Sequence, residues 1–170
     1  EDERVIQALF IGFAAMAVVS SLLVILHRNP VTSALFLVTA FCALAGIYIT
    51  LQAEFLGFVQ VIVYAGAIMV LILFVLMLLN MPEESRRARD PGTFQAGLGV
   101  VLAAAFVAVM GWAVFRAAPA EPYPSPSPTF GTVASVGMSL FRDYFYAFEA
   151  ISLLLVVAMV GAVVLAKRRL

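Results

Sequence analysis

The sequence predicts an all-α membrane protein with five transmembrane helices. Of its 170 residues, 64% are hydrophobic and only 12% are charged, and the mean hydropathy is +1.09. Soluble domains are typically about 45 to 50% apolar and about 25% charged, so this chain has too few polar residues to coat a water-soluble fold. A chain of this length is expected to form a single domain, residues 1–170, with the lipid bilayer as solvent for most of it.

Five apolar stretches are long enough to cross a bilayer, because a helix needs about 20 apolar residues to span about 30 Å of hydrocarbon. They cover residues 5–26, 31–51, 55–80, 96–115 and 144–166. The first follows acidic residues and exceeds the ~7 to 15 apolar residues of a signal core, so it is predicted to be a permanent anchor. Asn29 and Pro30 predict a tight turn after it. Residues 116–143 hold five of the eight prolines and are predicted to form an outer loop.

The distribution of basic residues predicts the orientation of the chain. Seven of the ten Lys and Arg residues lie in the first connection, the third connection or the C-terminal end, whereas the other side holds Arg4, Arg116 and Arg142. Because basic residues stay on the cytoplasmic side, the N-terminus is predicted to lie outside and the C-terminus in the cytoplasm. The formal net charge is zero, so no nucleic-acid partner is expected.

The chain lacks the residues needed to carry electrons or to pump protons by itself. The single cysteine, Cys42, is expected to be a small buried apolar group, and it excludes a Cys-ligated cluster built from this chain alone. No acid or base occupies a mid-membrane position, since Glu54 lies at the outer mouth of the third span and Glu149 about one and a half turns into the fifth. We therefore expect no cofactor or metal in this chain, and partner subunits that complete its chemistry.

The third span has one face of polar and small residues. On a wheel of 3.6 residues per turn, Gly57, Gln60, Tyr64 and Ala67 fall within about 80° of one another. This face is predicted to meet protein rather than lipid. One explanation is close helix packing, in which small residues let backbones approach and Gln or Tyr provides hydrogen bonds. Glu54 also has a structural explanation, because an acid at a helix N-terminus is stabilised by the helix dipole, and the alternative is a role in a proton path.

A functional explanation concerns Tyr64, Ala65, Gly66 and Ala67, near the middle of the bilayer. Three small residues beside a tyrosine support the helix weakly, and glycine lowers helix propensity by about 1 kcal/mol relative to alanine. An i to i+5 π-bulge is predicted there, and such bulges are frequent at functional sites. We hypothesise that a change between π and α winding opens or closes a water path. For Glu149, a structural partner and a proton-path role are both open.

Three stretches of the sequence resemble a known family. Residues 53–71 (AEFLGFVQVIVYAGAIMVL), residues 28–31 with 33–35, and residues 148–162 (FEAISLLLVVAMVGA) are similar to the J subunit of bacterial NADH:quinone oxidoreductase, respiratory complex I. Its mitochondrial counterpart is NADH dehydrogenase subunit 6. The resemblance covers all five spans in order. It does not extend to the proline-rich loop or the basic C-terminal end.

The resemblance implies a non-redox membrane-arm subunit of a proton-translocating complex in the bacterial inner membrane. The expected partners are the quinone-module and antiporter-like subunits, and NADH, FMN, iron-sulfur clusters and quinone are expected to be bound by other subunits. In that family the third helix carries a π-bulge at the stretch matched here by Tyr64 to Ala67. Rewinding of this bulge is proposed to gate hydration between the quinone region and the pump subunits.

Two other interpretations of the sequence compete with this one. The chain could be a purely structural scaffold whose small-residue faces serve only assembly of the membrane arm. It could also be an accessory subunit of a related antiporter or membrane-bound hydrogenase complex. The subunits that copurify with the chain would distinguish the last possibility, because flavin and iron-sulfur subunits with NADH dehydrogenase activity identify complex I.

Overall fold

The computed structural model describes residues 2–79, 93–117, 127 and 129–167, and all regular secondary structure in these residues is helical. Five helical stretches are long and apolar enough to cross a membrane, which confirms that part of the predicted fold. The helices are α1 (Asp2–Leu26), α2 (Pro30–Thr50), the continuous third span, α6 (Thr93–Ala117), α7 (Val133–Arg142) and α8 (Phe145–Ala166). The third span consists of α3 (Glu54–Val59), the π-helix η1 (Gln60–Ile68) and α4 (Met69–Leu79).

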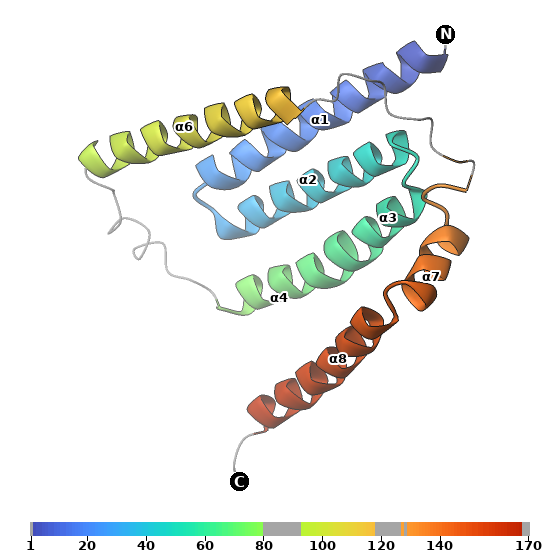
Figure 1. Cartoon of the computed structure of the whole chain (residues 1–170). Helices are drawn as coiled ribbons and strands as arrows, with labels where there is room; N and C mark the ends of the chain where they lie inside the picture. The colour runs from blue at the N-terminus through green and yellow to red at the C-terminus, as the bar shows by residue number, and fades with distance from the viewer. Residues whose placement is uncertain (1, 80–92, 118–126, 128, 168–170) are drawn as a thin grey trace.

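Helix α2 lies at the centre of the fold, between α1 and the third span (Figure 1). Its start is fixed by Asn29, whose side chain accepts a hydrogen bond from the Val31 N–H at 3.0 Å, with Pro30 in the first helical position as the sequence predicts. Small residues then let the neighbouring helices approach. A Cβ on Gly46 would lie only 2.7 Å from the ring of Phe13 on α1. The buried residues of α2 are Ala34, Ala40, Ala43, Ala45 and Gly46.

The turn from α2 to α3 is very short, and two backbone hydrogen bonds cap the C-terminal end of α2. Gln52 adopts a left-handed conformation with φ of 61° and donates its N–H to the Ile49 carbonyl, while Ala53 donates to the Tyr48 carbonyl at 2.9 Å. These two bonds form a Schellman motif with glutamine where glycine is usual. The motif places Glu54 at once in the first turn of the next span.

Helix α7 lies inside residues 116–143, which the sequence predicts as a proline-rich outer loop with no helix assigned to it. It starts at Thr132, whose hydroxyl accepts from the Ser135 N–H at 3.3 Å, and it packs against α3 and α8. The helix was not predicted because the prolines determine the average composition of the segment, although ten residues near its end are helical. The proline-rich half, residues 118–126 and 128, lies outside the described residues.

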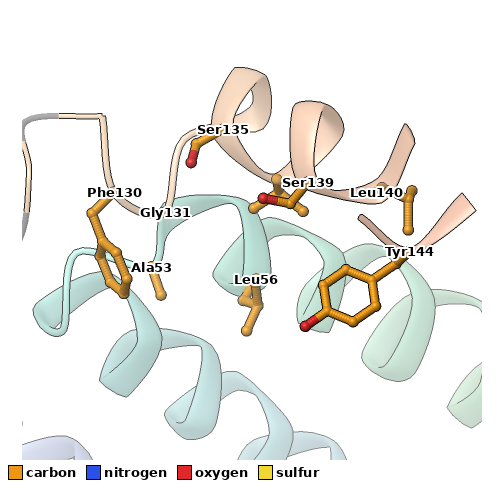
Figure 2. Close-up of a pocket in the computed structure, with 9 residues that line it drawn as sticks. Ala53, Leu56, Phe130, Gly131, Ser135, Ser139, Leu140 and Tyr144 are labelled. Atoms are coloured by element: carbon orange, nitrogen blue, oxygen red, sulfur yellow. The ribbon is translucent and has the colours of Figure 1, made fainter. Parts of the chain in front are cut away.

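Helix α7 sits over the beginning of the third span and leaves a cavity of about 380 Å³ beneath it. Figure 2 shows Leu56 and Tyr144 under α7, with Phe130 beside Ala53 at the α2–α3 turn. The two parts are joined by a hydrogen bond from the Phe55 N–H to the Gly131 carbonyl at 3.0 Å. The entry to the third span is therefore held from both sides, by α2 and by the loop before α7.

Helices α6 and α8 are peripheral. Among the described elements α8 contacts only α7, and α6 contacts none, although it passes close to α1 in the view of Figure 1. Nearly all of their described side chains are exposed. Apolar helices of this length with no polar face are expected to be covered by lipid or by neighbouring subunits.

Candidate functional site

The third span is wound as a π-helix from Gln60 to Ile68. The Met69 N–H donates to the Tyr64 carbonyl, five residues back rather than four. This nine-residue segment includes Tyr64, Ala65, Gly66 and Ala67, and it is longer than the single π-turn expected from the sequence. A Cβ on Gly66 would lie 3.3 Å from the Val61 carbonyl oxygen, so glycine fits this winding with the least crowding.

The π winding changes which residues of the third span face α2. Gly57 and Gln60 are buried against the bundle as the α-helical wheel predicts, but Ala67 is exposed and Met69 is buried instead, at 1% exposure. In an unbroken α-helix Met69 would lie about 180° from Gln60. One inserted residue turns it back by about 100°, to within about 20° of Gly57. For this reason Ala67 lies off the face that contacts α2, and its predicted contact with protein stays a prediction.

Tyr64 stands at the side of the segment, with its ring against Phe41 of α2. The ring centroids are 5.5 Å apart and the rings are tilted by 60°, a favourable geometry for an aromatic pair. Tyr64 is 45% exposed, so one side of the ring contacts α2 and the other faces outward. Phe41 is not predictable as part of this site, because nothing in the sequence indicates which residue of α2 meets Tyr64.

Gly57 marks the closest approach of α3 to α2. A Cβ there would lie 3.0 Å from Ile49 Cγ1 and 3.1 Å from the Ala45 carbonyl oxygen. Together with the buried Gln60, this contact fixes the N-terminal part of the third span on α2. In the C-terminal part of the span, Met69 is buried, Leu73 and Leu76 are only partly exposed, and the other side chains of α4 are exposed.

We expect Gly57→Ala to weaken the packing of α3 on α2 by about 1 to 2 kcal/mol, because the methyl group meets a backbone carbonyl that cannot change rotamer. The matched control is Gly12→Ala in α1, where a Cβ meets nothing within 4 Å and the change should be neutral or stabilise by about 0.5 to 1 kcal/mol. The temperature at which the purified complex dissociates measures both. Equal dissociation temperatures for Gly57→Ala and Gly12→Ala would show that the close approach of α3 to α2 does not contribute to stability.

The two acids named from the sequence are not brought together. Glu54 lies exposed in the first turn of α3, and Glu149 lies exposed on α8, which has no contact with η1. Cys42 is exposed rather than buried, which corrects the sequence-based expectation. In the described part of the chain no group of three or more His, Cys, Asp or Glu residues could hold a metal ion.

A polar and small-residue π-helical segment inside an apolar span is therefore the feature that the sequence and the fold share. Comparisons with known proteins place the chain in a family. The model of the family described as NADH-ubiquinone/plastoquinone oxidoreductase chain 6 matches residues 20–165. The chain belongs to this family. The match includes α2, η1 and α7, and it extends to Leu165 near the end of α8.

Curated relatives of the chain 6 family align with nearly the whole chain. The chain is 37% identical to NADH-quinone oxidoreductase subunit J of Rhodobacter capsulatus over 163 residues, which cover 94% of this chain and 80% of the relative. It is 36% identical to NAD(P)H-quinone oxidoreductase chain 6 of Leptolyngbya boryana over 165 residues, covering 94% and 78%. With subunit 10 of the Thermus thermophilus NADH-quinone oxidoreductase the identity is 36%, covering 88% and 83%.

The chain is thus a subunit of an NADH-quinone oxidoreductase, and not a catalytic centre by itself. Its apolar helices indicate a membrane-embedded subunit. As a chain 6 family member, it has the other subunits of the same multi-subunit enzyme as partners.

Proposed function

We propose that the chain couples quinone reduction to proton translocation by a change of winding in η1 that gates a hydrated path. The observation that carries this proposal is the π-helical segment Gln60–Ile68 inside a membrane span. In this proposal the NADH, FMN, iron-sulfur clusters and quinone belong to other subunits. The direct partners are the quinone-module and antiporter-like subunits of the membrane arm, in a bacterial inner membrane with the N-terminus of the chain outside.

The composition of η1 supports two windings of similar free energy. Hydrogen bonds in a π-helix are less favourable than in an α-helix, so a π segment persists where packing compensates for it. Here that packing includes Tyr64 on Phe41 and the burial of Met69. Gly66 and its alanine neighbours offer few side-chain contacts that would be lost on rewinding. A switch needs a gap of only a few kcal/mol between its two states.

The polar side chains of η1 are suited to gating a water path rather than to relaying protons themselves. Gln60 and Tyr64 are the only polar side chains of η1, and neither is a carboxylate, an amine or an imidazole. Protons would therefore move along water beside the segment. Rewinding to a regular α-helix would exchange Met69 for Ile68 on the face that meets α2 and turn Tyr64 toward the face of Gly57 and Gln60, which changes the room and polarity available to that water.

Gly66→Ala tests the proposal. The new methyl group crowds the Val61 carbonyl, and alanine favours α winding by about 1 kcal/mol, so the ratio of the two windings should shift about fivefold or more toward α. We expect normal assembly, with NADH:quinone reductase activity and proton pumping reduced together severalfold. Gly99→Ala in α6, where a Cβ meets nothing within 4 Å, is the control and should have normal activity.

The outcomes separate the gate from a purely structural scaffold. Failure of Gly66→Ala to assemble, with Gly99→Ala unaffected, would favour the scaffold, since packing would then be the only role of the segment. Fully coupled, normal turnover in assembled Gly66→Ala would contradict the gate.

A further inference from the structure

Helix α7 turns its hydroxyl groups toward the rest of the chain. The residues of α7 that line the cavity over the third span are Ser135, Val136, Ser139 and Leu140. On a wheel of 3.6 residues per turn these four fall within about 140° of one another. Figure 2 shows both serines on α7, above the start of the third span. One side of α7 therefore covers the cavity, and this side carries the hydroxyl groups of the helix.

The opposite side of α7 is apolar. Its residues are Val133, Ala134, Met138 and Phe141, which also fall within about 140° of one another, and all four are exposed. A helix on a water-exposed surface turns its apolar stripe toward the core and its polar residues outward. In α7 this order is reversed. The outward side of α7 is therefore suited to an apolar medium rather than to water.

Both ends of α7 lie beside the start of a membrane span. The loop before α7 is joined to the third span by the hydrogen bond from the Phe55 N–H to the Gly131 carbonyl. Only residues 143 and 144 separate the end of α7 from α8, and the third span and α8 begin at the same end of the molecule (Figure 1). Because a span begins where the hydrocarbon of the bilayer begins, α7 lies at the boundary between hydrocarbon and headgroups.

The C-terminal end of α7 has the residue types of a membrane interface. Phe141 packs on Phe148 with ring centroids 5.0 Å apart, so the apolar side of α7 continues into the surface of the span α8. Arg142 and Asp143 are exposed at this end, and Tyr146 is 85% exposed. Tyrosine is enriched at the level of the headgroups. The charges of Arg142 and Asp143 match those of a zwitterionic headgroup, which offers a phosphate and an amine.

We propose that the outward side of α7 lies against the acyl chains of bilayer phospholipids, with Arg142 and Asp143 at the level of the headgroups. A stable subunit interface involves about 20 to 30 residues a side, so the four side chains of this surface are too few to form one. Helix α7 thus separates the lipid from the cavity over the third span. The proposal is independent of the winding of η1.

A photoreactive side chain identifies the occupant in the intact complex in native membranes. Val133 or Met138 is replaced by p-benzoylphenylalanine, because both residues are exposed and leave room for the bulky probe. After irradiation the subunit is isolated and its mass is measured. We expect a gain equal to the mass of a membrane phospholipid at both positions, and a smaller gain after digestion with a phospholipase.

Position 139 is the matched control. Ser139 follows Met138 directly but lines the cavity, so the same probe there should cross-link within the chain, to the third span, and give severalfold fewer phospholipid adducts. Cross-links from positions 133 and 138 to another subunit would overturn the proposal, because protein would then cover this side of α7. No adduct at either position would overturn it as well, since it would indicate water. Equal phospholipid adducts at 138 and 139 would show that α7 does not have two different sides.

Discussion

Deleting Ala65 should leave the complex assembled and reduce coupled turnover at least tenfold. A π segment contains one residue more than the α-helix that joins the same two ends. Removing one residue from Gln60–Ile68 therefore lets a regular α-helix connect Gly57 and Gln60 to Met69 with all three in their present places. The helix would then hold one winding permanently. NADH:quinone reductase activity and proton uptake into membrane vesicles measure the loss, and quantification of the purified complex measures assembly.

Deletion of Leu71 is the matched control for this experiment. It removes one residue from α4, the part of the same span where the helix is regular. Everything beyond it turns by about 100°, so Leu73 and Leu76 leave the face that follows Met69, and assembly should fail. Equal assembly of the two deletion variants would show that η1 has no extra residue to lose. Full activity after deletion of Ala65 would show that rewinding is unnecessary.

Gly131→Ala should produce the largest loss of stability, about 2 to 4 kcal/mol. Gly131 has φ of +71°, and a Cβ there would overlap the Gln52 carbonyl oxygen and lie 2.7 Å from the Ala53 Cα. Both are backbone atoms, so no rotamer change relieves the clash. The left-handed conformation adds strain for any L-residue. The hydrogen bond from the Phe55 N–H to the Gly131 carbonyl is also expected to be lost.

The consequence should be local detachment of α7 from the start of the third span. Thermal dissociation of the complex and protease cleavage near α7 would detect it. Gly137→Ala is the control, because this glycine lies within α7 and a Cβ there meets nothing within 4 Å. Its expected effect is neutral or stabilising by about 0.5 to 1 kcal/mol. Equal protease sensitivity of both variants would contradict a role of Gly131 in holding α7.

The five long helices follow from the sequence because hydropathy and length alone determine them. The cap at Asn29 and Pro30 is equally local, and it forms as predicted. Helix α7 was missed because the prolines before it determine the average composition of the segment, although Thr132 before a ten-residue run is a usable N-cap signal. The left-handed Gln52 has no signal of its own, since glycine is the residue that usually marks such a position.

The candidate site was predictable in part. The residues of η1 stand out as the only small and polar stretch of the third span, and Gly57 and Gln60 were placed correctly on the inner face. The burial of Met69 was not predicted, because a wheel of 3.6 residues per turn assumes an unbroken helix, and the π winding shifts every later residue. Phe41 depends on the register of α2 against the third span, which one sequence does not contain.

The most direct test of the gate is a density map of the intact complex, at rest and during turnover, that shows the backbone carbonyls from Val61 to Met69. The proposed gate predicts two windings. In one the Met69 N–H donates to the Tyr64 carbonyl, as in the present structure, and in the other it donates to the Ala65 carbonyl, with ordered water beside Tyr64 in only one of the two. A Met69 N–H bonded to Tyr64 in every state, with no change in the surrounding water, would contradict it.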